Sequence, residues 1–251
     1  GTNKEDHESD KIWTKGVIFN TEITNPSNYR SLKKLDTWLK KNKIVGITGL
    51  DTRSLTNFIR DKGAPKGTIS NNNKGIFNLK KLTNNSIKWP GLNGLDLAKI
   101  VTTKKKYIWK GFKTWKKEKG FEKNKKKKYK IIAIDYGIKK NILRYFSNFN
   151  CEVIVVPCSL EAEDIIKLKP DGIFLSNGPG DPAATGKYAI DIIQKLIKIN
   201  IPIFAAVPIK PARRGRETLA HASLINATPL GHMPPTPMQT MKRTNKSWVG
   251  D

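Results

Sequence analysis

Apolar positions repeat with two different rhythms along this chain of 251 residues. Before about residue 100, short apolar runs alternate with stretches that place apolar side chains on one helical face. The elements expected there are strands over 13–19 and 44–47, a helix over 31–41, and a helix that Asp51 or Thr52 begins and Gly63 closes. Leu55, Phe58 and Ile59 would point inward from this second helix. With a turn and a short helix over 89–97, this part is predicted to be a compact α+β unit.

A second rhythm starts at Lys130, where apolar strands and amphipathic helices alternate at short intervals. The expected strands are 131–135, 152–157, 172–176 and 202–204, and the expected helices are 139–149, 162–168 and 188–199. Strands and helices that alternate at this spacing form right-handed crossovers. The pattern therefore predicts an α/β fold with a doubly wound parallel sheet, preceded by the smaller α+β unit.

The stretch between the two patterns is rich in lysine. Trp109, Phe112 and Trp115 are interspersed with lysines from about residue 102 to 128, which predicts a connection over the surface that ends in a solvated linker. The predicted organisation is an N-terminal domain over 1–115, a Lys-rich linker over 116–129, a sheet domain over 130–206 and a tail over 207–251.

The formal net charge of +26 raises the question of nucleic-acid binding, because clustered lysines can neutralise phosphates. The lysines are scattered, with concentrations at Lys104–Lys106 and Lys123–Lys128. They lack the aromatic pattern of an RNA-binding sheet and any helix-turn-helix signature. A solvated surface and linker is therefore favoured over a nucleic-acid site.

Cysteine content and hydropathy bear on the setting of the protein. Cys151 and Cys158 flank a predicted strand, where small core or edge positions are favoured over nucleophiles, and two cysteines do not suggest a disulfide framework. This fits a reducing, cytoplasmic environment. The sequence has no apolar run of about 18 residues, so no membrane span is expected, and its start without Met indicates a fragment.

Candidate chemistry gathers in the loop that follows the strand over 172–176. The sequence there is Phe-Leu-Ser-Asn-Gly-Pro-Gly-Asp-Pro over 174–182. Gly178 and Gly180 lack a Cβ, so a ligand can approach their N–H groups closely, and ligands of parallel sheets bind beyond the carboxyl ends of strands. An ordinary turn between strand and helix is the alternative for an isolated Gly-x-Gly.

Two groups of motifs extend beyond this loop. The stretches Ile-Asp-Tyr-Gly-Ile-Lys-Lys-Asn-Ile-Leu-Arg over 134–144 and Pro-Asp-Gly-Ile-Phe-Leu-Ser-Asn-Gly-Pro-Gly-Asp-Pro over 170–182 resemble the amidotransferase domain of the carbamoyl phosphate synthase small chain. Upstream, Gly-Leu-Asp-Thr-Arg-Ser-Leu-Thr over 49–56 and Pro-Gly-Leu-Asn-Gly-Leu-Asp-Leu-Ala-Lys over 90–99 resemble the N-terminal domain of that same family. The resemblance runs in unbroken order to about Phe204.

The resemblance implies a flavodoxin-like sheet, here an incomplete class I glutamine amidotransferase domain. Members of the family hydrolyse glutamine through a cysteine thioester and pass ammonia to a large chain. That partner uses ATP, with Mg, and bicarbonate to make carbamoyl phosphate for pyrimidines and arginine, so no cofactor is expected in this chain. The family's loop backbone holds glutamine, and its first glycine supplies an oxyanion N–H; these roles carry over to Gly178 and Gly180.

The sequence departs from the family after the fourth predicted strand. The family has a nucleophile elbow there, Gly-x-Cys-x-Gly-His-Gln, whereas this chain reads Ala-Ala-Val-Pro-Ile-Lys-Pro over 205–211. Val207 falls on the nucleophile position and cannot form a thioester. Pro208 has no N–H to donate to an oxyanion, and a β-branched Val suits the strained elbow poorly. No catalytic residue is therefore assigned.

Composition changes at the same place. All three Met residues but only three Lys lie after Phe204. Our hypothesis is that the reading frame was lost, or foreign sequence joined, near Ala205, which leaves a largely disordered tail; a real divergent extension is the alternative. His221 and His232 are not assigned as catalytic bases, and the spacing of Glu217 and His221 is a weak metal signal.

Two functions of different class remain. The first is the glutaminase role of the carbamoyl phosphate synthase small chain, with the large chain and glutamine as partners, although the chain as written is predicted to be inactive. The second is a non-catalytic remnant that only binds the large chain or binds glutamine weakly. A basic nucleic-acid binder is a distant third.

Overall fold

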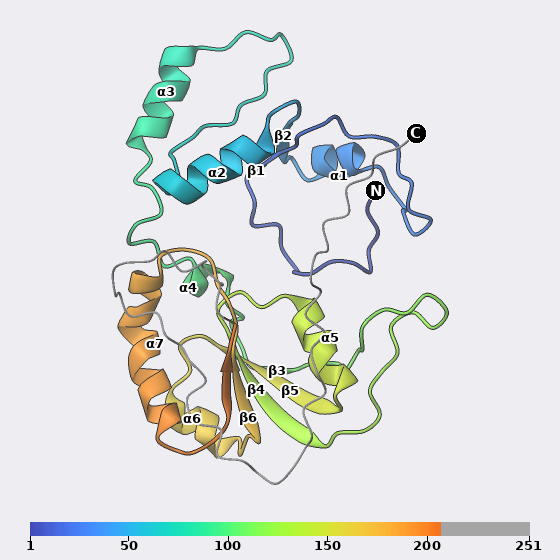
Figure 1. The fold of residues 1–251 in the computed structure, drawn as a ribbon, viewed down its shortest axis with the longest axis vertical. Helices are drawn as coiled ribbons and strands as arrows, with labels where there is room; N and C mark the ends of the chain where they lie inside the picture. Colours follow the sequence, from blue (N-terminus) through green and yellow to red (C-terminus); the bar gives the residue numbers. More distant parts are fainter. Residues whose placement is uncertain (207–251) are drawn as a thin grey trace, which may run out of the picture.

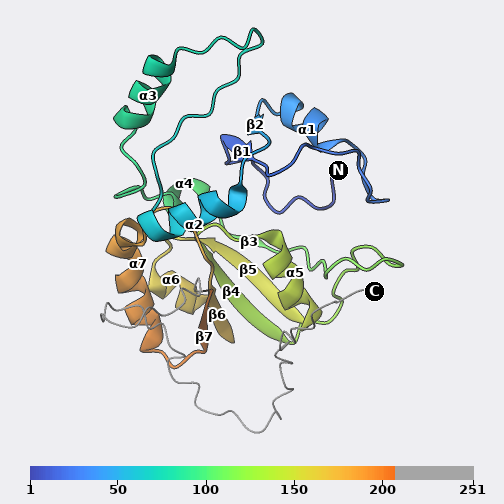
Figure 2. The ribbon, with the colours of Figure 1, turned by 45° about the horizontal axis from the view of Figure 1, so that its top comes forward.

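The computed structural model describes residues 1–206 and contains two separate sheets. The smaller sheet belongs to the N-terminal part of the chain and the larger one to the part after residue 106, with helix α4 between them (Figures 1 and 2). Within residues 1–206, none of the helices has the length and apolar content needed to cross a membrane.

The N-terminal part is built around two short parallel strands. Its elements are β1 (Gly16–Ile18), α1 (Leu35–Lys41), β2 (Val45–Ile47), α2 (Thr52–Lys62), α3 (Leu79–Lys88) and α4 (Ala98–Val101). Asp51 begins α2 as expected, since its side chain accepts hydrogen bonds from the N–H groups of Arg53 and Ser54.

One expectation for this part is wrong, and one helix was not predicted. Phe58 and Ile59 do not point into a core: they are 51% and 41% exposed, and α2 has no buried residue. An amphipathic pattern specifies a face but not the element that covers it, and here the two-stranded sheet is too small to do so. Helix α3 was not predicted. Its start is set by the Asn78 side chain, which accepts from Lys81 N–H at 2.9 Å, and α3 also buries nothing.

The second part has the elements that its alternating pattern predicts, together with strand β3, which was not predicted. They are β3 (Tyr107–Ile108), β4 (Tyr129–Asp135), α5 (Lys140–Asn148), β5 (Cys151–Pro157), α6 (Ala162–Lys167), β6 (Gly172–Leu175), α7 (Pro182–Ile197) and β7 (Ile203–Ala205). Helix α7 begins at Pro182, earlier than expected, because Asp181 caps it and proline fits the first turn of a helix.

The larger sheet has the strand order β3-β5-β4-β6-β7, in which β4 to β7 are parallel. The first parallel strand thus lies between the second and third, which is the flavodoxin-like order. Helix α5 covers one face, and α6 and α7 cover the other (Figure 1). The predicted α/β fold with a doubly wound parallel sheet is confirmed.

Alternate residues of β4 show how both faces are buried. Ile132 and Ile134 pack in the cluster beneath α6 and α7, whereas Ala133 packs in the cluster beneath α5. All three are at most 1% exposed. A strand buried on both sides reads as a continuous apolar run, which explains the clear signal in the sequence.

The stretch between the two parts does more than cross the surface. Tyr107 and Ile108 pair antiparallel with β5, so β3 extends the larger sheet at one edge. Beyond it, isolated bridges join Phe112 to Lys123 and Lys116 to Gly120, and these fold the Lys-rich stretch back on itself. Strand β3 has only two residues, both exposed, and follows the lysines at 104–106, so the hydrophobic pattern gives no signal for it.

Candidate functional site

Two loops meet where the strand order of the larger sheet reverses. One follows β4 and the other follows β6, and these strands are neighbours. The hydroxyl oxygen of Ser176 accepts a hydrogen bond from Tyr136 N–H at 2.9 Å. The Asp135 carboxylate turns its own loop by accepting from the N–H groups of Gly137 and Ile138 at 2.9 and 2.8 Å. Open parallel sheets bind ligands at this position.

Gly178 and Gly180 lie in the loop after β6, as the sequence predicts, and each is pressed against protein on its Cβ side. A Cβ on Gly178 would lie 2.4 Å from the Tyr136 carbonyl oxygen. Gly180 has φ +96°, and a Cβ there would lie 2.6 Å from the Leu95 carbonyl oxygen. The glycines are therefore needed to fit the loop into the protein, in addition to any role toward a ligand.

The outward side of this loop is open. Residues 177–179 are exposed and Gly180 is half-buried. Among residues 1–206, no acceptor receives a hydrogen bond from the N–H of Gly178 or of Gly180. Two unused backbone donors on an ordered, exposed turn can hold a carbonyl, carboxylate or oxyanion oxygen.

The loop is also tied to residues 94–97, far away in the sequence. The Asp181 carboxylate accepts from Gly94 N–H at 2.7 Å and from Ala183 N–H at 2.9 Å. In return, Asp181 N–H donates to the Leu95 carbonyl at 3.0 Å. The two backbone hydrogen bonds, from Gly94 first and Ala183 second, lower the pKa of Asp181 below its ordinary value.

A buried polar cluster lies behind the loop. Tyr136 is 6% exposed, and its hydroxyl has no hydrogen-bond partner among the described residues. Burial, with a smaller contribution from Cys158, raises the pKa of Tyr136 to about 12. The Tyr188 hydroxyl contacts Cys158 Sγ at 3.4 Å and Asp96 Oδ1 at 3.4 Å, and burial raises the pKa of Tyr188. The two tyrosine hydroxyls therefore stay neutral near pH 7.

The two cysteines are buried, as the sequence predicts. Cys151 is 8% exposed and Cys158 is fully buried. Burial raises the pKa of Cys151, with a smaller contribution from Asp171, which disfavours the thiolate that a nucleophile needs. Neither cysteine has the properties of a reactive thiol.

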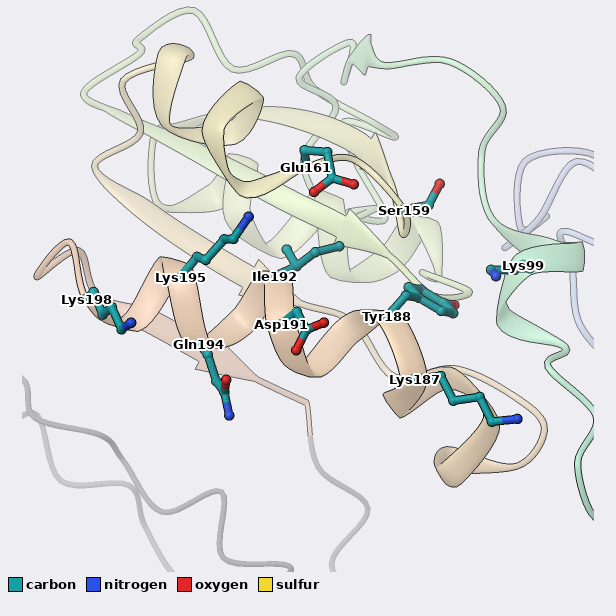
Figure 3. Close-up of a pocket in the computed structure, with 10 residues that line it drawn as sticks. All are labelled: Lys99, Ser159, Glu161, Lys187, Tyr188, Asp191, Ile192, Gln194, Lys195 and Lys198. Carbon is teal, nitrogen blue, oxygen red and sulfur yellow. The ribbon is translucent and has the colours of Figure 1, made fainter.

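A groove of about 530 Å³ runs along α7 on the side of α6. Figure 3 shows its lining side chains, among them Tyr188, Asp191 and Lys195 of α7 and Lys99 of α4. None of Gly178, Gly180 and Asp181 lines it. Four lysines and two carboxylates line the groove, and one of these lysines, Lys195, pairs with Glu163 at 2.9 Å. Residues 1–206 contain no group of three or more side chains that could hold a metal ion.

Several sequence-based assignments fall outside the described residues. Val207, Pro208, Glu217, His221 and His232 lie beyond residue 206, as does the predicted tail. The structure therefore bears on the loop of Gly178 and Gly180 and not on the nucleophile position.

Sequence reasoning missed the role of Asp181. The signal was present, because an Asp directly before Pro at the start of an amphipathic stretch is a helix N-cap signature. Its second bond, to Gly94, had no local signal, since 87 residues separate the partners. The segment over 90–99 was noted only for its resemblance, not as a support of the loop.

Comparisons with known proteins divide the chain in the same way as the two sheets. The family model for the carbamoyl-phosphate synthase small chain, CPSase domain, matches residues 1–69, and the model for class-I glutamine amidotransferases matches 132–206. The chain is 49% identical over 208 residues to the carbamoyl phosphate synthase small chain of Bradyrhizobium diazoefficiens. The match covers 81% of this chain and 52% of that protein.

Other relatives carry the same name. The small chain of Rhizobium meliloti is 50% identical over 191 residues, covering 75% of this chain and 47% of that protein. The small chain of Agrobacterium fabrum is 47% identical over 209 residues, and the match covers 81% of this chain and 52% of that protein. This chain therefore spans about half the length of the curated relatives it matches.

Proposed function

We propose that this chain, which belongs to the carbamoyl-phosphate synthase small chain family, supplies one half of the glutamine site of a glutaminase subunit. The observation that carries the proposal is the loop at the reversal point of the sheet, where Gly178 is exposed, Gly180 is half-buried, and the N–H groups of both have no acceptor among residues 1–206. Gly178 N–H would donate to the carbonyl oxygen of the glutamine side chain, and Gly180 N–H would help to hold the substrate.

In the proposed reaction, the complete subunit hydrolyses glutamine and delivers ammonia to a large chain that makes carbamoyl phosphate. A fixed N–H directed at the oxygen that becomes negative stabilises the transition state by roughly 2.7–4 kcal/mol. ATP and Mg would act in the large chain and not here.

The nucleophile position, which would form the other half of the glutamine site, leads us to propose that this chain does not hydrolyse glutamine. A thioester requires a thiol, and Val207 stands where the family has its cysteine. Cys151 and Cys158 are buried and cannot replace it. A non-catalytic role, in which the chain binds glutamine weakly or binds the large chain, is favoured by this arrangement.

The test is titration of L-glutamine into the full chain by calorimetry, together with an ammonia-release assay. We expect weak, saturable binding and no ammonia above background. Gly178→Ala should abolish binding, because its Cβ would collide with the Tyr136 carbonyl. Gly67→Ala is the control, since a Cβ on Gly67 would meet nothing within 4 Å and its φ is not in the left-handed region, so binding should be unchanged.

Two results would contradict the proposal. Absence of saturable glutamine binding by the unmodified chain would overturn the assignment of the loop. Ammonia release that a thiol-alkylating glutamine analogue abolishes would overturn the proposed inactivity.

A further inference from the structure

The loop that carries Gly178 and Gly180 is held by residues that neither family model covers. Residues 94–97 lie between the matched ranges 1–69 and 132–206. They contact the loop at three points: Gly94 N–H on the Asp181 carboxylate at 2.7 Å, the Leu95 carbonyl on Asp181 N–H at 3.0 Å, and the backbone of Leu95 and Leu97 against Gly180.

The contact at Gly180 leaves no space. A Cβ on Gly180 would lie 2.6 Å from the Leu95 carbonyl oxygen and 2.8 Å from the Leu97 nitrogen. Real Cβ atoms do not approach backbone atoms this closely, so only glycine fits at position 180. The backbone of residues 95–97, called the wall below, packs directly against the turn of the loop. The wall fixes the backbone angles of Gly180, including its φ of +96°.

Neighbouring contacts hold the wall in place. Asp96 Oδ1 accepts from the Thr185 hydroxyl at 3.3 Å, on the first turns of α7. Ala98 is 1% exposed and belongs to the core cluster beneath α7. Thr103 N–H donates to Asp135 at 2.7 Å, at the end of β4. The segment is thus anchored on both sides of the loop, and α4 joins it to the sheet (Figure 2).

We propose that residues 94–97 act as a latch that fixes the conformation of the Gly178–Gly180 loop, with Asp181 as the positioning residue. Asp181 serves two elements at once, because one carboxylate oxygen caps α7 through Ala183 N–H and the other holds Gly94 N–H. The latch keeps the loop in the conformation in which neither glycine N–H has an acceptor among residues 1–206, so that both can donate to a ligand. The effect of the latch on ligand binding rests on the proposed glutamine site. The contact between residues 94–97 and the loop does not, because it is formed within the chain.

The test separates the latch from the cap. In Asp181→Ser the single hydroxyl still caps α7, since Ser is a preferred N-cap, but it is too short to reach Gly94 as well. Asp51→Ser is the matched control, because Asp51 caps α2 and has no contact with the loop. Both variants are measured in the full chain by amide exchange and amide chemical shifts in NMR, with global unfolding followed in parallel.

In Asp181→Ser we expect exchange at Gly94 to become roughly tenfold faster, and the amide shifts of Gly178 and Gly180 to move. Glutamine binding should weaken by roughly tenfold as well. Gly180→Ala places a Cβ against the backbone of Leu95 and Leu97 and so displaces residues 95–97. Amide exchange at Gly94 should therefore become faster in this variant as well. Asp51→Ser should leave all three measurements unchanged.

Unchanged exchange at Gly94 and unchanged loop shifts in Asp181→Ser would overturn the latch. So would faster exchange combined with unaltered glutamine affinity, because the loop would then not depend on residues 94–97. If the unmodified chain binds no glutamine but Asp181→Ser still moves the loop shifts, the latch stands and the proposed function fails.

Discussion

The two parts of the molecule share the same local signals for helices and strands but differ in how much they bury. Leu39 is the one buried hydrophobic side chain of residues 1–97, whereas the larger sheet and its helices bury nearly all the others. In the larger sheet, helices cover both faces of four parallel strands. In the N-terminal part, two strands of three residues each offer no comparable surface.

The difference teaches that helix signals and packing are separate requirements. Helix α2 has a well-formed cap at Asp51 and an apolar stripe, yet Phe58 and Ile59 stay exposed. Helix α5 has no side-chain cap, yet Leu143 and Ser147 are fully buried against the sheet. Most helix stability in proteins comes from tertiary packing, so α5 is expected to be the more stable of the two.

The largest expected effect compares one core residue with one exposed apolar residue. Leu143→Ala should lower the free energy of unfolding by about 2–5 kcal/mol, because it leaves a cavity under α5. Ile59→Ala, at a position that is 41% exposed, should change it by no more than about 0.5 kcal/mol. Urea unfolding followed by circular dichroism measures both. Equal losses would mean that α2 is covered in solution.

A smaller effect is expected at one of the two ion pairs that join the N-terminal segment to α5, the other being that of Asp10 with Lys140. Glu8 accepts from Arg144 Nη1 and from Asn141 N–H, both at 2.7 Å, and so holds the N-terminal segment to the start of α5. The Arg144 side chain is 8% exposed and Glu8 38%. Glu8→Gln should therefore cost about 1–1.5 kcal/mol after allowance for solvent screening.

The control for this pair is an exposed one within a single helix. Asp36→Asn removes the partner of Lys40 in α1, where both side chains are largely exposed, and should cost no more than about 0.5 kcal/mol. The same urea experiment compares the two variants. A Glu8→Gln loss no larger than that of Asp36→Asn would show that the pair of Glu8 and Arg144 does not hold the N-terminal segment to α5.

The smallest expected effect is a pH dependence that both parts share. Backbone hydrogen bonds at the caps lower the pKa of Asp51, chiefly that from Ser54 N–H, and the pKa of Asp181, chiefly that from Gly94 N–H, below the ordinary value of 3.8. Because the folded pKa is lowered, the stabilisation is present above pH 3.8 and is lost as the pH falls through the folded value.

Carboxyl titration by NMR measures both groups directly. We expect each to titrate below 3.8, and we expect Asp181→Ser to remove the part of the acid-induced loss of stability that Asp181 causes. A titration of Asp181 at or above the ordinary value would mean that the bond to Gly94 does not form in solution, which would also count against the latch.

Much of the fold was readable from local pattern. The apolar run of β4 and the amphipathic stretches after it predicted a doubly wound sheet, because a strand buried on both faces leaves a continuous apolar signal. The candidate site was also readable locally, because Gly178 and Gly180 interrupt the sequence directly after an apolar strand. Helix α3 and strand β3 escaped because neither contributes a buried side chain.

The sequence by itself determined the alternation of parallel strands and helices in the larger sheet, the cap at Asp51, and the presence of a glycine turn after β6, and it held an unrecognised cap signal at Asp181. Tertiary structure alone decided which amphipathic faces are covered and what the glycines are for inside the protein. Gly180 turns against Leu95, and Asp181 binds Gly94 across 87 residues. The physical reason is that caps and apolar periods are short-range properties of the chain, whereas contacts between distant backbones form only once the sheet has brought them together.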